Sequence, residues 1–315
     1  MKDLIIREIK GEDLQGVCAV AKAELIVDPV TPELFALKVF LDMNFDPSGV
    51  LVAEADNKIV GFIVSYIRTH PIEDMPDDSA NCWITLFAVH PEYQNRGIGN
   101  ELFSRVENWL KENKKSNILV GPYTPNWWLP GIDVNAYPDT IKWLEKRGYV
   151  EAVRPLSMDS DLIKYRRPDW VNEKESALLA DGVKFVDFTP ELIPLLFAFL
   201  KREFPGDWQR HLRYTITRIL NYEALPSQIK IAVEDSKVVG FAHHDGERFG
   251  PFGTASSQRG RGLGAVLLCR TLETMRSRGL HNAFFMWTND VTAKLYAEMG
   301  FRESRRFSLL KKNLA

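Results

Sequence analysis

Two short turns rich in glycine and arginine are the residues of this 315-residue chain whose types and spacing best suit chemistry. The first reads Gln94-Asn95-Arg96-Gly97-Ile98-Gly99, and the second reads Arg259-Gly260-Arg261-Gly262-Leu263-Gly264. Each stands between an extended segment and an amphipathic helix. Such a turn aims backbone N–H groups, a helix N-terminus and guanidinium groups at one point, which suits a pyrophosphate or another polyanion. Two such turns predict two similar domains.

The sequence around the two turns also repeats. Residues 53–62 correspond to residues 232–241, and each stretch is an apolar strand, a polar turn and a second apolar strand, which predicts a hairpin. The separation between copies is 179 residues at Asp56 and Asp235, 165 at Gly97 and Gly262, and 152 at Gly148 and Gly300. The first copy therefore carries two insertions, around residues 70–81 and 121–137.

The periodicity of apolar residues predicts strands in series with helices, built twice, which is an α/β fold. The expected order in each copy is a strand, two helices, a hairpin, a further strand, the glycine turn with its helix, a strand, a helix and a last strand. The segment around Arg166-Arg167-Pro168-Asp169 has no strong strand pattern and is expected to be a linker. The predicted domains are residues 1–162 and 182–315, joined by a linker at residues 163–181.

Composition excludes several functional classes. Lys and Arg total 40 against 42 for Asp and Glu, so the charge balance gives no general case for a nucleic-acid or membrane partner. No apolar run approaches the length of a membrane span, and the first residues lack the apolar region of a signal peptide, so the cytoplasm is the expected compartment. The three cysteines are widely spaced and the histidines do not cluster, so neither disulfides nor a metal site is expected.

The order of motifs resembles a known family. A hairpin, a strand ending in Val89-His90-Pro91, a glycine turn and a helix, followed in the second copy by Asn289, Ala293, Tyr296 and Gly300-Phe301, resemble the GNAT superfamily of acyl-CoA-dependent N-acetyltransferases. The resemblance covers nearly the whole chain as two tandem GNAT domains, an arrangement similar to mycothiol synthase. It implies a mixed, mostly antiparallel sheet flanked by helices in each domain.

The resemblance also implies a co-substrate site for acetyl-CoA, with no metal. The amides of residues 97–100 and 262–265 would hold the pyrophosphate, and a backbone N–H at the end of the strand before each turn would polarise the thioester carbonyl, as in an oxyanion hole. The implied cofactor-binding residues of the first copy are Val89, Gln94, Asn95, Arg96, Gly97, Ile98, Gly99 and Asn100. Those of the second copy are Phe252, Thr254, Arg259, Gly260, Arg261, Gly262, Leu263, Gly264, Ala265, Asn289 and Tyr296.

The two copies differ where the family often places a tyrosine as general acid. Aligning Gly148 with Gly300 puts Leu144 opposite Tyr296, so we expect catalysis in the C-terminal domain, with Tyr296 as the acid and Thr254 beside the thioester. The candidate bases follow the hairpin strand that borders the acceptor side of this fold: His243, His244 and Glu247.

The expected acceptor is a primary amine of a small molecule, such as an amino sugar, a polyamine or an antibiotic. The acidic loop Glu73-Asp74 and Asp77-Asp78 is a candidate to attract a cationic amine, and Trp127-Trp128 is expected to wall a pocket or to pack on the second domain. Four alternatives stay open: a non-catalytic acyl-CoA sensor or scaffold, a protein or peptide N-acetyltransferase, two active domains, and a dinucleotide fold, since Gly260 to Ala265 fits G-x-G-x-x-A. The oligomeric state is not predicted.

Overall fold

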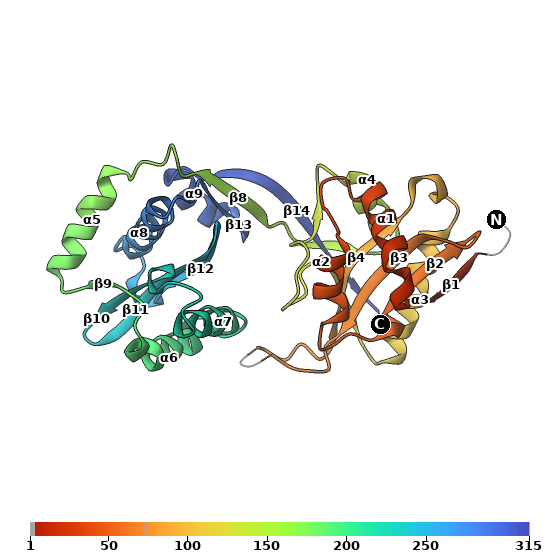
Figure 1. The fold of residues 1–315 in the computed structure, drawn as a ribbon, viewed down its shortest axis with the longest axis horizontal. Helices are drawn as coiled ribbons and strands as arrows, with labels where there is room; N and C mark the ends of the chain where they lie inside the picture. The colour runs from red at the N-terminus through yellow and green to blue at the C-terminus, as the bar shows by residue number, and fades with distance from the viewer. Residues whose placement is uncertain (1–3, 73–74, 315) are drawn as a thin grey trace. The chain divides into compact units, whose positions relative to one another are not determined.

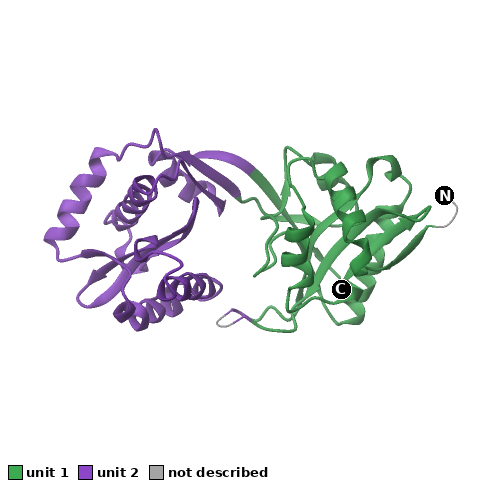
Figure 2. Cartoon of the chain, viewed as in Figure 1, with its two compact units in different colours: residues 1–71, 77–155, 306–315 green, residues 72–76, 156–305 purple. Residues whose placement is uncertain are grey.

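The chain forms two compact units. The computed structural model describes residues 4–72 and 75–314. Unit 1 comprises Met1–Pro71, Asp77–Pro155 and Arg306–Ala315, and unit 2 comprises Ile72–Pro76 and Leu156–Arg305 (Figure 2). Each unit contains a sheet with helices on both faces (Figure 1). The α/β fold with two similar domains is therefore confirmed.

Unit 1 is built on the strand order β1-β2-β3-β4-β5-β14, with β6 and β7 also pairing with β14. Its pairs are antiparallel except β4 with β5, which is parallel. The strands and helices of this unit are β1 (Ile5–Glu8), α1 (Leu14–Glu24), α2 (Pro32–Phe35), β2 (Val50–Ala55), β3 (Lys58–Ile67), β4 (Asn81–Val89), α3 (Ile98–Glu112), β5 (Asn117–Val120), β6 (Ile132–Asp133), α4 (Pro138–Lys146) and β7 (Val150–Val153).

Two apolar layers hold the helices of unit 1 on its sheet. Helix α3 buries Leu102, Val106 and Leu110, the apolar face that the 3.6-residue period predicts, together with Leu144 of α4. Helices α1 and α2 pack in a second cluster that includes Val17 and Phe35. The sheet therefore has α3 and α4 on one face and α1 and α2 on the other.

Unit 2 repeats this architecture with the strand order β8-β13-β12-β11-β10-β9. Helix α8 covers one face of its sheet, while α6 and α7 pack in a separate cluster on the other (Figure 1). Its strands and helices are β8 (Leu156–Asp161), α5 (Asp169–Ala180), β9 (Lys184–Asp187), α6 (Ile193–Glu203), α7 (Trp208–Leu220), β10 (Ile229–Glu234), β11 (Lys237–Asp245), β12 (Arg248–Thr254), α8 (Leu263–Ser277), β13 (Asn282–Thr288), α9 (Asp290–Glu298) and the beginning of β14 (Arg302–Asn313).

The last strands of the two copies are exchanged between the units. Strand β8 ends the first copy, yet it pairs with β13 of unit 2. Strand β14 ends the second copy, yet its residues from 307 onward pair with β5, β6 and β7 of unit 1. The two compact units therefore divide the chain at other points than the predicted residues 162 and 182, because a repeat in the sequence identifies equivalent strands without saying which sheet each one joins.

The segment predicted as a linker contains a helix. Helix α5 fills most of residues 163–181 and buries Val171 and Leu178 in the same core as α8. Only these two of its residues are buried, so its sequence carries a weak amphipathic pattern. The linker prediction is corrected accordingly.

Candidate active site

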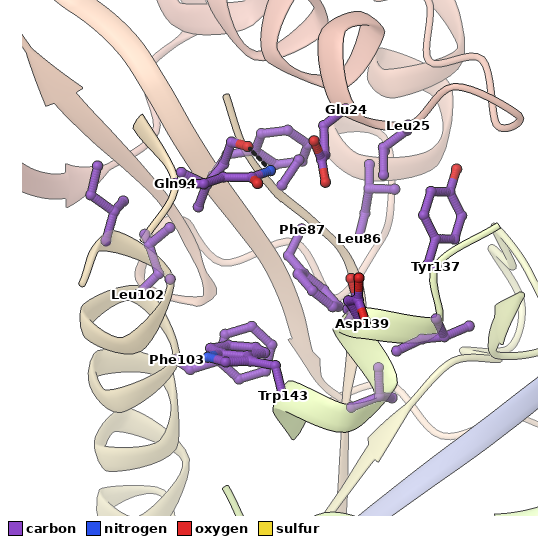
Figure 3. Close-up of a pocket in the computed structure, with 18 of the residues that line it drawn as sticks. Glu24, Leu25, Leu86, Phe87, Gln94, Leu102, Phe103, Tyr137, Asp139 and Trp143 are labelled. Atoms are coloured by element: carbon purple, nitrogen blue, oxygen red, sulfur yellow. Dashed lines mark hydrogen bonds between the residues drawn. The ribbon is translucent and has the colours of Figure 1, made fainter. Parts of the chain in front are cut away.

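A wedge opens in the sheet of unit 1 where β4 and β5 part. The two parallel strands pair only from Asn81 opposite Asn117 to Ile84 opposite Val120, and a last hydrogen bond runs from the Gly121 N–H to the Ile84 carbonyl at 3.1 Å. Strand β4 continues to Val89 alongside β3. A cavity of about 680 Å³ lies at this divergence, lined by the second half of β4, the first turn of α3, the start of α4 and the end of α1 (Figure 3).

The predicted turn of unit 1 forms one end of this cavity. Gly97 has a φ of 86° and precedes α3, and a Cβ built on it would meet no atom within 4 Å. The N–H groups of residues 98–100 belong to the first helical turn, which has no intrahelical acceptors, and the N–H of Glu101 makes the first helical bond, to the Gly97 carbonyl at 3.0 Å. The turn thus presents an accessible helix N-terminus, a geometry that binds anions.

Two side chains fix this turn. Gln94 donates through Nε2 to the Val89 carbonyl at 3.1 Å, which ties the turn to the end of β4. Arg96 donates through Nη2 to the Glu92 carbonyl at 2.6 Å and lies over the ring of Tyr93 at 5.2 Å. Among the predicted residues, Val89, Gln94, Asn95, Gly97, Ile98, Gly99 and Asn100 line the cavity together.

The charged side chains of the described cavity wall are acidic. Glu24, Asp28 and Asp139 contribute carboxylates, and Tyr137 donates its hydroxyl to Oδ2 of Asp28 at 2.9 Å. Burial raises the pKa of Glu24, and the Gln94 amide and His90 offset part of that effect. The described lining residues include no Lys, Arg or His. These acidic groups were not predicted from the sequence. The signal that was available is the position of Glu24 at the end of the first helix, α1.

Aromatic rings pack together beside the equivalent strands of unit 2. Strands β12 and β13 are in parallel register at Arg248 and Phe284. Beyond that point the ring of Tyr296 lies 4.3 Å from that of Phe285 and 6.2 Å from that of Phe252, measured between centroids. Tyr296 is 8% exposed, and burial raises its pKa. Tyr296, Phe285 and Phe252 thus pack against one another beside these strands of unit 2.

Protein groups also cover the glycine turn of unit 2. Gly262 has a φ of 89°, and a Cβ built on it would lie 2.8 Å from Cγ of Lys174 on α5. Arg261 donates to Glu234 at 2.9 Å and to Asp181 at 3.0 Å, so its charge is neutralised within the protein. Of the other residues predicted here, Arg259 and Gly260 are exposed, Gly264 is half-buried beside Phe252, and Leu263 and Ala265 are buried.

The two histidines predicted as bases serve as internal contacts. His243 uses Nε2 toward Oγ1 of Thr215 at 2.9 Å and Nδ1 toward the Gly250 carbonyl at 2.9 Å, and burial lowers its pKa to about 4. His244 is 1% exposed and contacts the Gly246 carbonyl through Nδ1 at 3.0 Å. Their catalytic role stays a prediction. The contact with Thr215 joins β11 to α7, and the contacts with the Gly250 and Gly246 carbonyls lie within the hairpin of β11 and β12.

Three further predicted residues also have local partners. Glu247 accepts from the Asn282 N–H at 3.2 Å. Asn289 caps α9, since its Oδ1 accepts from the Val291 N–H at 3.0 Å and the Thr292 N–H at 2.9 Å. Thr254 ends β12 opposite Gly240 and is half-buried. None of these contacts requires a ligand.

The two loops singled out in the sequence make contacts within unit 1 where the structure describes them. Asp78 pairs with Arg68 at 2.8 Å, while Glu73 and Asp74 lie outside the described residues. Trp128 packs against the cluster that holds α1 and α2, within unit 1. The same loop reaches the cavity through Leu129.

Comparison with known proteins decides the family. A model of the acetyltransferase (GNAT) family matches residues 21–126 and 193–301, one match in each copy. The chain belongs to the GNAT family of acetyltransferases. No curated protein sequence matches this GNAT chain.

Solved structures share the tandem GNAT fold at low sequence identity. The GCN5-related glucosamine N-acetyltransferase region of a fungal multi-domain GH3 beta-N-acetylglucosaminidase superposes with a TM-score of 0.80 at 20% identity; the match covers 98% of this chain and 38% of that one. A GCN5-related N-acetyltransferase from Sphaerobacter thermophilus gives 0.72 at 17% identity over 100% of this chain and 96% of that one. A tandem GNAT protein from the clavulanic acid biosynthesis pathway gives 0.61 at 15% identity over 99% of both chains.

Two kinds of feature are not found among the described residues. In that part of the chain, no group of three or more His, Cys, Asp or Glu side chains is arranged to hold a metal ion. No helix among the same residues is long and apolar enough to cross a bilayer.

Proposed function

We propose that this GNAT protein transfers an acetyl group from acetyl-CoA to a primary amine of a small molecule, and that the reaction takes place in the cavity of unit 1. One observation carries the proposal: the accessible turn at Gly97 and the open wedge between β4 and β5 border the same cavity. In unit 2, Lys174 packs against the corresponding turn, and the rings of Tyr296 and Phe285 pack together beside the corresponding strands. The cytoplasm stays the proposed compartment.

The geometry suits each part of the co-substrate. The N-terminus of α3 would bind the diphosphate through the amides of residues 98–100. The pantetheine would run along β4 from Val89 into the wedge, where β4 lacks a neighbour on that side. Thr85 forms a bulge there, because Ile84 pairs with Ser65 while Leu86 pairs with Val64. A backbone N–H at this bulge would polarise the thioester carbonyl.

The chemistry balances as direct transfer. The amine nitrogen attacks the carbonyl carbon, the C–N bond forms and the C–S bond breaks. The nitrogen loses one proton and the departing thiolate gains one, so the products are an amide and free coenzyme A. No covalent enzyme intermediate is needed, and the three cysteines of the chain are all buried.

The cavity wall favours a cationic acceptor of modest size. Three carboxylates with no basic residue in the described lining attract a protonated amine. The fungal structure of similar fold is described as a glucosamine N-acetyltransferase region, so an amino sugar is one acceptor to test first. A polyamine, with more than one positive charge, is the second.

Release of free thiol from acetyl-CoA tests the proposal. Wild-type protein is incubated with glucosamine, spermidine, an aminoglycoside, amino acids, a peptide and a folded protein. We expect release with one class of small amine. Coenzyme binding without release for any amine would favour the sensor or scaffold, and release only with the peptide or the folded protein would contradict a small-molecule acceptor.

A further inference from the structure

Glu24 and Glu203 are equivalent residues with different partners. Each ends the first long helix of its copy, α1 or α6, and they are related by the same 179-residue separation as Asp56 and Asp235. Glu203 accepts a hydrogen bond through Oε2 from the N–H of Ser256, at 3.0 Å, just after β12. In unit 2 this glutamate therefore joins helix to strand.

A proline removes that role from Glu24. The 165-residue separation of the two glycine turns places Pro91 opposite Ser256, and proline has no N–H to donate. Glu24 instead lines the cavity, where its carboxylate is turned toward the amide of Gln94 (Figure 3). Gln94 is itself fixed by its 3.1 Å hydrogen bond to the Val89 carbonyl. The carboxylate is thus held at the end of β4 without the structural partner that its counterpart has.

The other acidic groups of the cavity suit this position less well. Asp28 accepts the hydroxyl of Tyr137 at 2.9 Å. Asp139 lies in the first turn of α4, is exposed, and contacts Lys142 at 3.0 Å. Glu24 is half-buried, and burial raises its pKa, which brings its proton affinity closer to that of an amine.

We propose that Glu24 is the general base of the acetyl transfer. Its carboxylate takes a proton from the acceptor ammonium, the neutral amine attacks the thioester carbonyl, and the C–S bond breaks as the C–N bond forms. The second proton leaves the nitrogen as the thiolate gains one, and Glu24 returns its proton to solvent. This role rests on the proposed function, because it requires the reaction to occur in unit 1.

The variant Glu24→Gln tests the assignment. Removing a general base lowers kcat by about 100-fold or more, while the KM for acetyl-CoA stays within about twofold. The acid limb of the pH profile of kcat, which reports protonation of Glu24, is lost. The titratable groups that face Glu24 across the cavity or act on it are Asp28, His90, Tyr93, Tyr137 and Asp139, and the variant leaves all of them in place. Glu24→Asp should recover part of kcat.

Two matched variants use the repeat itself. Glu203→Gln changes the equivalent residue of unit 2, and kcat and its pH profile should match wild type. Pro91→Ser gives Glu24 the N–H partner that Glu203 has, so it should lower kcat by drawing the carboxylate away from the cavity. A rate and pH profile unchanged in Glu24→Gln would overturn Glu24 as base while leaving transfer in unit 1 intact. Absence of thiol release by wild type with every amine would overturn the proposed function as well.

Discussion

The ring of Tyr296 lies 4.3 Å from the ring of Phe285 in unit 2, where the equivalent pair in unit 1 is Leu144 and Val120. The two smaller side chains belong to the apolar core beside the wedge between β4 and β5, which is open. The two larger rings belong to the aromatic group beside β12. On the proposed function, this pair of smaller side chains leaves room for the thioester in unit 1.

Val120→Phe should close the wedge of unit 1. The ring would occupy the space that Phe285 fills in unit 2, so we expect the affinity for acetyl-CoA to fall at least about tenfold, measured by isothermal titration calorimetry. Overpacking costs about 1–3 kcal/mol of stability, so thermal unfolding must show that the variant is folded at the assay temperature. Phe285→Val is the matched control, and equal losses of affinity in both variants would contradict a site confined to unit 1.

Tyr296→Phe should leave the transfer rate within about twofold of wild type. The structure gives the Tyr296 hydroxyl no hydrogen-bond partner among the described residues, and the ring is packed against Phe285. Steady-state kinetics with the best amine measures the effect. A fall of tenfold or more in kcat would restore the C-terminal catalysis predicted from the sequence, with this tyrosine as the acid.

Deleting residues 306–315 should unfold unit 1 although no cavity residue is removed. Phe307, Leu309 and Leu310 are buried there, and burial of each large apolar side chain contributes about 1.5–3 kcal/mol. Their sum approaches the whole stability of a typical domain, about 5–15 kcal/mol. Acetyl-CoA binding and the thermal transition of unit 1 should both be lost. Retention of binding in the shortened chain would show that the exchanged strand is dispensable.

Acidification should weaken unit 1 through Asp13. Hydrogen bonds from Arg7, both at 2.7 Å, lower the pKa of this carboxyl, which is 5% exposed. A lowered folded pKa stabilises the protein above the unfolded value of about 3.9, and that contribution is lost as the pH falls from there through the folded pKa. Thermal melts from pH 7 to pH 3 should show a steeper loss for wild type than for Asp13→Asn. If wild type and Asp13→Asn lose thermal stability in parallel as the pH falls, Asp13 does not cause the acid sensitivity of unit 1.

The fold could be predicted because its signals are local. The hairpins, the amphipathic face of α3 and the glycine turns before α3 and α8 depend on residues close in sequence, and each appears where expected. The exchange of β8 and β14 could not be predicted, because the choice of sheet depends on partners far along the chain. Helix α5 was missed because only Val171 and Leu178 of its residues are buried.

The residues that line the cavity of unit 1 could be predicted only in part, because some of them come together from distant parts of the chain. The turn at Gly97 was found from its residue pattern, while Tyr296 fits the family pattern and yet lies among aromatic rings. Val120 of β5 and Phe285 of β13 differ in volume, and we propose that this difference decides how much space remains beside each strand. In the sequence, both are apolar strand residues, so the pattern alone does not reveal the difference. The role of Glu24 depends on the missing N–H of Pro91, which only a comparison of hydrogen bonds in the two copies reveals.

The most direct test of the central claim is hydrogen–deuterium exchange of the full chain with and without acetyl-CoA, resolved by peptide. The account predicts slower exchange on binding in peptides that cover residues 85–100 and 136–143, with no change in those that cover residues 248–265. Protection confined to residues 248–265 would contradict the account and would place the co-substrate in unit 2.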